Sequence, residues 1–283
     1  MAQGDAIAPV AQSVCLTQVI APKIDAMFTA LLSHMAPPVA RGARRLLDAV
    51  LPPQCPVTGE AVRDPGVLSA AGWSKLQFID DPACASCGAP FAYDHGDGAM
   101  CGACIANRPA FDSARAALLY DDASHKLIVA FKHADRTEYA PMFGAWLARR
   151  AAATTPDGAV LVPVPLHPRR LAARRYNQSA LIAGHAAKLL DRRHEPQVLI
   201  RRRATPPQQQ LSEAARKRNV AGAFAVDEER CDLIRDRHII LVDDVLTTGA
   251  TLSACARALK SAGAARVDAL VLARVARGGA VAI

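Results

Sequence analysis

The chain has 283 residues, of which 51% are hydrophobic and 21% charged, and its formal net charge is +8 at pH 7. This balance can bury a core and therefore excludes a wholly disordered chain, while the length predicts one full domain with a smaller one. No window approaches ~18 consecutive apolar residues, and the N-terminus lacks the basic start and compact apolar run of a signal peptide. We therefore expect a cytoplasmic protein without a membrane span.

The positive charge is concentrated in one segment. Between residues 169 and 218, 13 Lys or Arg residues stand against three acidic residues, a balance of +10, so the rest of the chain carries −2. A solvated face, a phosphate-bearing small molecule and a nucleic-acid backbone each suit such a cluster. Aromatic residues, the usual stacking partners of bases, are only 5% of the chain. The charge alone leaves these three alternatives open.

Three zones follow one another along the chain. Residues 1–50 are Ala-rich and predict a mobile N-terminal extension, with a helix near 39–51 that ends at two prolines. Residues 52–110 hold five of the eight cysteines, many Gly and Pro and almost no long periodic run, which indicates a small domain built around something other than an apolar core. From residue 111 to 283, strand and helix patterns alternate.

Two C-x-x-C pairs, Cys84 with Cys87 and Cys101 with Cys104, are separated by 13 residues. Each pair can place two thiolates on one ion through a tight turn, so the four residues predict a tetrahedral zinc site. Free thiols and two disulfides are the alternatives, and a cytoplasmic setting disfavours the disulfides. With four protein ligands the metal would be structural and would leave no position open for chemistry.

Two earlier stretches, CPVTG at 55–59 and SAAGW at 69–73, resemble knuckles that have lost most of their cysteines. Thr58, Ser69 and Gly72 stand where three ligands would be expected, and Cys55 alone cannot hold zinc. We therefore expect a zinc ribbon over 52–110 with one intact and one degenerate half.

The third zone predicts a mostly parallel sheet that is covered by helices on both faces. The predicted strands are 114–120, 159–165, 198–200, 238–242 and 267–272. The predicted helices are 124–133, 138–151, 171–190 and 251–262, and a long polar connection covers 204–222.

The stretch from 239 to 251, IILVDDVLTTGAT, carries most of the chemistry. An apolar strand delivers Asp243 and Asp244 to its carboxyl end, where ligands bind in open α/β sheets. A turn rich in Thr and Gly then leads into a helix, and its N–H and hydroxyl groups can bind a phosphate monoester. Carboxylates beside it can accept hydrogen bonds from sugar hydroxyls and help to hold magnesium. A helix cap after a turn is the structural alternative; the whole stretch favours a ribose 5-phosphate site.

This stretch looks like the signature of type I phosphoribosyltransferases, which bind phosphoribosyl pyrophosphate (PRPP). Around it lie the two C-x-x-C pairs, VPVPL at 162–166, a basic helix with Asn-Gln, and a Gln-rich loop. This order resembles the ComF family, also called double zinc ribbon phosphoribosyltransferases, over roughly 47–275. The chain departs from that pattern in the first half of the ribbon. It also departs at 174–178, where Arg-Arg-Tyr-Asn-Gln replaces the usual Arg-Gly-Phe-Asn-Gln.

The resemblance implies a type I phosphoribosyltransferase fold after the ribbon, with zinc in the ribbon and magnesium bound with PRPP. Asp243 and Asp244 would contact the ribose, and Arg216 and Lys217 would act in catalysis from a mobile loop over 205–222. The residues expected to bind PRPP are Val245, Leu246, Thr247, Thr248, Gly249, Ala250, Thr251, Pro165, Leu166, His167, Arg169 and Arg170. The residues alone leave alternatives open. Pro163 and Pro165 could be mere strand breakers, and His167 could be a capping residue. The loop could be a plain connection, and Lys132 could either orient that loop or simply be solvated.

Two functions follow from this resemblance. The first is transfer of ribose 5-phosphate from PRPP to a nucleobase acceptor. The second is a non-catalytic accessory role in DNA uptake, with single-stranded DNA as a partner and PRPP as a regulator.

Overall fold

The structure is a computed structural model that describes residues 52–132, 136–203, 218–220 and 222–276. Contacts divide the chain into two units, Met1–Pro53 and Gln54–Ile283. The predicted N-terminal extension, the helix near 39–51 and the candidate catalytic residues Arg216 and Lys217 lie outside the described residues.

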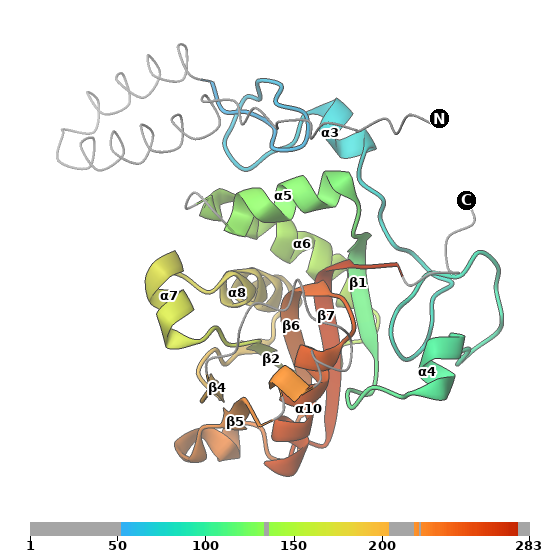
Figure 1. Ribbon diagram of the computed structural model, residues 1–283, viewed down its shortest axis with the longest axis vertical. Coiled ribbons are helices and arrows are strands. Elements are labelled where there is room, and N and C mark those ends of the chain that lie inside the picture. The colour runs from blue at the N-terminus through green and yellow to red at the C-terminus, as the bar shows by residue number, and fades with distance from the viewer. Residues whose placement is uncertain (1–51, 133–135, 204–217, 221, 277–283) are drawn as a thin grey trace, which may run out of the picture. The chain divides into compact units, whose positions relative to one another are not determined.

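A parallel sheet forms the centre of the Gln54–Ile283 unit, which confirms the predicted α/β class (Figure 1). Its five strands have the order β1-β7-β6-β2-β3, and every neighbouring pair is parallel. The strands are β1 (Ala114–Leu119), β2 (Val160–Pro163), β3 (Arg193–His194), β6 (His238–Leu246) and β7 (Arg266–Arg274). Most residues of β2, β6 and β7 are buried, as expected for parallel strands covered on both faces.

Helices cover the two faces of this sheet. One buried cluster joins the sheet to α5 (Asp122–Lys132), α6 (Ala140–Ala151) and α8 (Gln178–Leu190), with the 3-10 helix η1 (Thr137–Tyr139) leading into α6. The other joins it to α10 (Ala250–Ser261), to the 3-10 helix η2 (Glu228–Leu233) and to an antiparallel pair, β4 (Leu199–Arg201) and β5 (Phe224–Val226). Leu252, Cys255 and Leu259 share one side of α10 and are buried, so the predicted amphipathic helix packs as its period requires.

Three predicted elements differ in the structure, and the sheet strand β3 was not predicted. The helix expected over 171–190 is two helices, α7 (Pro168–Arg174) and α8, because Arg175 has a φ of 63° and Asn177 caps α8 by accepting from Ser179 N–H at 3.1 Å. The strand expected to end at residue 242 continues to Leu246. The strand expected over 198–200 is β4, which lies outside the parallel sheet and pairs with the unpredicted β5.

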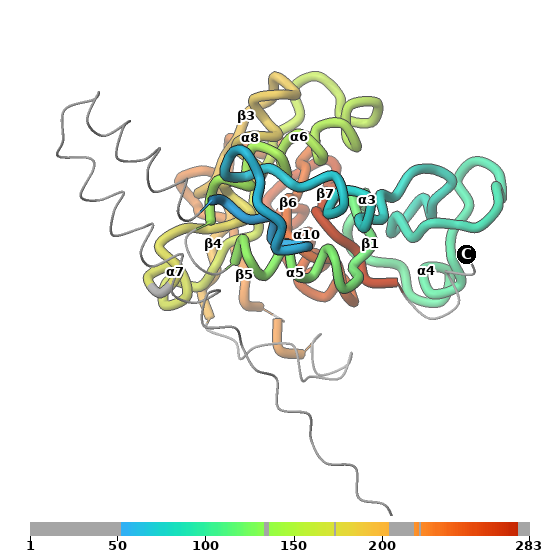
Figure 2. Tube along the Cα trace, turned by 90° about the horizontal axis from the view of Figure 1, so that it is seen from above, coloured from blue at the N-terminus to red at the C-terminus, as the bar shows by residue number. Residues whose placement is uncertain are grey.

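The cysteine-rich segment contains two short helices, α3 (Ala70–Ser74) and α4 (Gly102–Ala106), and borders β1. Residues 77–79 run antiparallel to the free edge of β1, with Ile79 N–H donating to Ala117 O at 2.9 Å and Leu119 N–H to Gln77 O at 2.8 Å. This pairing covers an edge that would otherwise be open to association. In both views α4 lies on the β1 side of the sheet and α7 on the opposite side (Figures 1 and 2).

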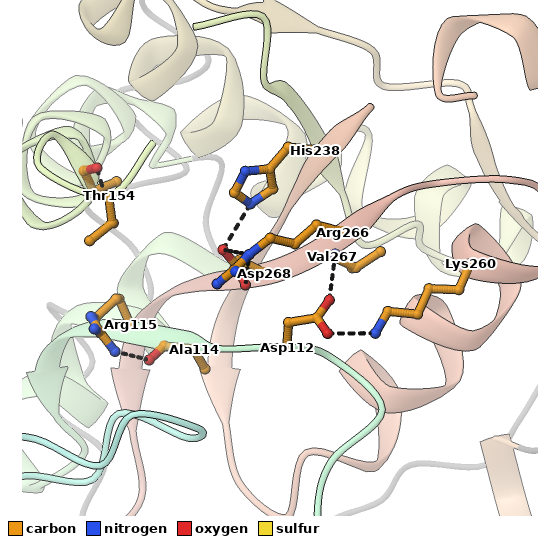
Figure 3. A network of polar contacts seen from close by, with 10 residues as sticks. Asp112, Ala114, Arg115, Thr154, His238, Lys260, Arg266, Val267 and Asp268 are labelled. Carbon is orange, nitrogen blue, oxygen red and sulfur yellow. Dashed lines mark hydrogen bonds and ion pairs between the residues drawn. The ribbon is translucent and has the colours of Figure 1, made fainter. Parts of the chain in front are cut away.

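A polar network joins the amino ends of the central strands (Figure 3). The buried Asp268 accepts from Arg266 Nε at 3.0 Å and lies 2.8 Å from His238 Nε2. Burial raises the pKa of Asp268, but hydrogen bonds from His238 and Arg266 outweigh this effect and hold the pKa at about 2. Nearby, Asp112 bridges Lys260 Nζ and Val267 N–H, each at 2.8 Å. These contacts fix the end of the sheet that lies opposite the candidate site.

Candidate functional site

Asp243 and Asp244 lie in the last part of β6, near the carboxyl end of the central strand. Ser179, near the start of α8, donates its hydroxyl to Asp243 Oδ1 at 3.1 Å. Lys132, the last residue of α5, places Nζ 2.7 Å from Asp244 Oδ2. The two carboxylates are therefore held by helices α8 and α5, which pack on the same face of the sheet.

The environment of Asp243 favours its neutral form more than that of an exposed carboxyl does. Burial and then the charge of Asp244 raise its pKa to about 7, against the opposing effects of the Asp244 N–H, Lys132 and Ser179. Adjacent carboxylates that repel one another are the arrangement that a divalent cation relieves, and their hard oxygen donors suit magnesium. The pair is therefore a donor set of the kind that suits a divalent cation.

The turn after β6 leads directly into α10. Gly249 caps this helix with a φ of 77°, and a Cβ placed there would meet the ring of Phe111 at 3.4 Å. A left-handed φ favours glycine and is strained for a β-branched residue. Thr248 Oγ1 accepts from Ala250 N–H at 3.4 Å. Of the residues predicted to bind phosphate, Val245 and Leu246 end the strand, Thr247 and Thr248 form the turn, and Ala250 and Thr251 begin the helix.

The loop after β2 lies beside the end of β6. Val164 N–H donates to Val242 O at 2.9 Å, and Asn177 Nδ2 donates to Val164 O at 3.1 Å, so the loop is tied both to β6 and to the start of α8. His167 caps α7 by accepting from Arg169 N–H at 3.3 Å, which is the capping role weighed from the sequence. Pro165 and Leu166 precede it, and Arg169 and Arg170 lie in the first turn of α7.

Two contacts at this edge were not predicted from the sequence, those of Ser179 and Arg201. Burial and then the charge of Arg170 lower the pKa of Arg201, whereas the charge of Asp243 acts in the opposite direction. Arg201 also lies over the ring of Phe224 at 5.3 Å. In the sequence it is one member of the basic segment at 169–218, whereas in the structure it is the last residue of β4 and pairs with Phe224 of β5.

The four predicted zinc ligands come together. The sulfur atoms of Cys84, Cys87, Cys101 and Cys104 all lie within 4.8 Å of one another, and Cys87 Sγ is 3.6 Å from Cys101 Sγ. Sulfur atoms in a tetrahedral zinc site with bonds of about 2.3 Å are about 3.8 Å apart, so the donor set fits the metal. Cys101 N–H also donates to Cys84 Sγ at 3.2 Å. Zinc bound by these four cysteines would stabilise the ribbon and would take no part in a reaction.

A double zinc ribbon domain matches residues 46–105, and a phosphoribosyl transferase domain matches residues 177–281. The chain is 33% identical over 208 residues to DNA utilization protein YhgH of Escherichia coli, which covers 71% of this chain and 88% of that one. It is 30% identical to Competence protein F of Haemophilus influenzae over 71% and 88%, and 29% identical to Competence protein ComFC of Bacillus subtilis over 71% and 81% of the two chains. The chain belongs to the ComF family.

The first half-ribbon (residues 54–76) of this ComF chain has the same local backbone as the second half-ribbon (residues 83–106). Cys55 donates its N–H to Glu60 O at 2.8 Å and accepts from Gly59 N–H at 2.8 Å; Cys84 makes the equivalent bonds at 2.7 and 2.8 Å. Ser69 caps α3 with φ −67° and ψ 159°, and Cys101 precedes α4 with φ −68° and ψ 155°. The degenerate half therefore keeps both knuckles.

Hydrogen bonds take the place of metal bonds in this first half-ribbon. Thr58 Oγ1 and Ser69 Oγ lie 3.0 Å apart, and Ser69 Oγ accepts from Gly72 N–H at 3.0 Å. A Cβ at Gly72 would lie 2.5 Å from Cys55 Sγ, so the thiol of Cys55 fills the space that a fourth ligand would need. The four positions singled out from the sequence are adjacent, as a lost ligand set requires.

The second departure from the ComF pattern has a local structural solution. Arg175 stands where the family usually has glycine and adopts the positive φ that glycine favours. Tyr176 follows it, and its hydroxyl donates to Phe131 O at 2.7 Å. This bond ties the α7–α8 turn to the residue before Lys132.

Among the described residues, no helix is both long and apolar enough to cross a membrane.

Proposed function

We propose that this chain binds magnesium PRPP at the carboxyl ends of β6 and β2 and transfers its ribose 5-phosphate to a nitrogenous base. One observation carries this proposal: the acidic pair, the Thr-Gly turn before α10 and the loop before α7 meet at one edge of a parallel sheet, tied by the Val164–Val242 hydrogen bond. Ligands bind at this edge in open α/β sheets. The match to a phosphoribosyl transferase domain supports the proposal.

Each part of the ligand has a matching group. Residues 247–251, at the start of α10, offer amide and hydroxyl groups to the 5-phosphate. Asp243 and Asp244 would accept hydrogen bonds from the ribose hydroxyls, with Lys132 holding Asp244 in place. The loop at 164–167 and the guanidinium groups of Arg169, Arg170 and Arg201 would meet the diphosphate, because planar guanidinium groups match phosphate oxygens in pairs. Magnesium would neutralise part of the diphosphate charge.

The reaction would be displacement of pyrophosphate from C1 of PRPP by a nitrogen nucleophile. The C1–O bond to the diphosphate breaks with its electron pair on the leaving oxygen, and the new C–N bond takes its electrons from the nucleophile. The proton of the attacking nitrogen leaves to the released pyrophosphate or to water. Proteins accelerate such a step mainly by positioning the reactants and stabilising the leaving charge. The acidic pair, the turn before α10 and the arginines would supply that positioning and charge without a covalent intermediate.

The Asp244→Asn variant tests the ribose contacts. It keeps the shape but removes an ionised acceptor worth roughly 1.5 to 3 kcal/mol, so affinity for magnesium PRPP should fall by about one to two orders of magnitude. The measurement is calorimetric titration, with Asp232→Asn as control, because the Asp232 side chain is 86% exposed and lies on η2. A wild-type protein that binds no PRPP at millimolar ligand would refute the proposal. Pyrophosphate release with a panel of nucleobases then tests turnover.

A second candidate function is non-catalytic binding of single-stranded DNA. The names of the relatives, DNA utilization protein and Competence protein, favour it, as does the basic segment at 169–218. Titrating single-stranded DNA at two salt concentrations separates the two functions. Contacts to a nucleic-acid backbone lose affinity with a slope of about −0.7 per phosphate in log salt. If DNA binds in this manner while pyrophosphate is never released, the accessory role is the better account.

A further inference from the structure

Arg274 is a buried cation at the point where the ribbon meets the sheet. It is the last residue of β7, its exposed fraction is 1%, and its Nη1 donates to the backbone carbonyl of Cys87. Among the described residues, no carboxylate forms an ion pair with Arg274, and its buried Nε has no hydrogen-bond partner. A guanidinium buried in this way is costly unless a negative charge lies nearby.

The four-cysteine cluster can supply that charge. Four thiolates on one Zn²⁺ carry a net charge of −2, and Cys87, whose carbonyl Arg274 contacts, is one of the four. We propose that Arg274 is the counter-charge of the zinc–thiolate cluster and links the ribbon to the end of β6, from which the turn before α10 begins. Charge balance beside a metal changes how firmly its ligands hold it.

The link to the loop passes through the backbone of the same residue. Arg274 is paired in register with Leu246, the last residue of β6, and with Leu119 of β1. Val275 N–H donates to Leu246 O at 3.0 Å, and Tyr120 N–H donates to Arg274 O at 2.7 Å. Thr247, the first residue of the turn before α10, follows Leu246 directly. The side chain of Arg274 thus reaches the zinc site while its main chain supports the turn.

The first test measures how fast zinc leaves the full-length protein. Arg274→Met keeps an unbranched side chain that can remain buried and removes the charge, and we expect it to release zinc to a colorimetric chelator about ten times faster than wild type. Arg274→Lys should fall between the two. Arg266→Met is the matched control: it removes an arginine at the other end of β7, 54% exposed and paired with Asp268, and should release zinc at the wild-type rate.

A folded Arg274→Met protein with wild-type circular dichroism and a wild-type rate of zinc release would overturn the proposal. If that variant does not fold, Arg274→Lys decides. Release less than about ten times faster than from wild type supports a role of charge, and release ten times faster or more refutes it. This zinc measurement does not depend on PRPP.

The second test concerns the link to the loop and rests on the proposed function. If zinc is retained by adding it in excess, Arg274→Met should still bind magnesium PRPP about three to ten times more weakly than wild type, and Arg266→Met should not. Equal affinities of wild type and Arg274→Met would overturn the link. If wild type itself binds no PRPP, the proposed function fails and the link fails with it, but the zinc-release result for the counter-charge stands.

Discussion

The two half-ribbons follow the same backbone plan and are buried in different ways. In the first, Cys55, Val57 and Leu76 belong to the hydrophobic cluster that contains α5, α6 and the sheet. In the second, Cys84, Cys87 and Cys104 form a small cluster with Ala89 and a few partly buried neighbours. A small unit with little core of its own needs a metal or another cross-link to be stable, whereas one that packs on a larger core does not.

This difference explains where the ligands have been lost. The first half-ribbon also approaches η1 closely, since a Cβ at Gly66 would lie 2.3 Å from Glu138 O. Tertiary packing and the Thr58–Ser69–Gly72 hydrogen bonds stabilise it without four thiolates. In the second half-ribbon, the stabilising groups among the described residues are chiefly the four cysteine sulfur atoms and the hydrogen bond from Arg274 to the Cys87 carbonyl. The first half-ribbon thus keeps the backbone of a zinc knuckle without the ligands, because its buried residues join a neighbouring core.

The largest expected effect comes from removing one ligand in the second half-ribbon. Cys84→Ser should reduce bound zinc from one per chain to nearly none, because it removes one of the four thiolates that would hold the ion. Structural zinc contributes about 10 kcal/mol or more to the folding of small ribbons, so the second half-ribbon should unfold when zinc is lost. Elemental analysis measures the stoichiometry, and hydrogen exchange over residues 83–106 reports local unfolding. Cys55→Ser is the matched control and should leave one zinc per chain. Loss of zinc from both variants would mean that the two halves share the metal.

Rebuilding the first site should have the next largest effect. The triple variant Thr58→Cys, Ser69→Cys, Gly72→Cys supplies a four-thiolate set with Cys55 on a backbone that already has the knuckle geometry. We expect two zinc ions per chain, and with cobalt in place of zinc, about twice the sulfur-to-metal absorption. The Cys55 thiol must turn away from position 72, which the metal bond would favour. A stoichiometry of one in a folded triple variant would show that the first half-ribbon has lost the geometry as well as the ligands.

The features that could be predicted from sequence are those with a strong local pattern. The apolar runs of β6 and β7, the period of α10 and the paired cysteines each determine an element or a site by themselves. The Asp243–Asp244 pair at a strand end was predictable for the same reason. The positions of these elements follow from general rules for parallel α/β sheets.

The features that were missed depend on contacts between distant residues. The break between α7 and α8 needs Arg175 in a left-handed conformation, which the Tyr176–Phe131 hydrogen bond helps to hold. The strand β5 has three residues and exists only through its pairing with β4. Arg274 is one arginine among many in the sequence, and only the fold shows that it is buried beside Cys87.

The smallest expected effect concerns the space that the missing ligand has left. At Gly72 an added Cβ would lie 2.5 Å from Cys55 Sγ and 3.2 Å from Ser69 Oγ, whereas at Gly102 it would meet nothing within 4 Å. Overpacking a filled site typically costs about 1 to 3 kcal/mol, so Gly72→Ala should destabilise the protein by that amount in urea unfolding, while Gly102→Ala, at the start of α4, should change little. In the background Cys55→Ala, which removes the sulfur, the penalty of Gly72→Ala should nearly vanish. If the penalty persists there, the thiol does not fill the vacant ligand position, and the contrast between the two half-ribbons must have another cause.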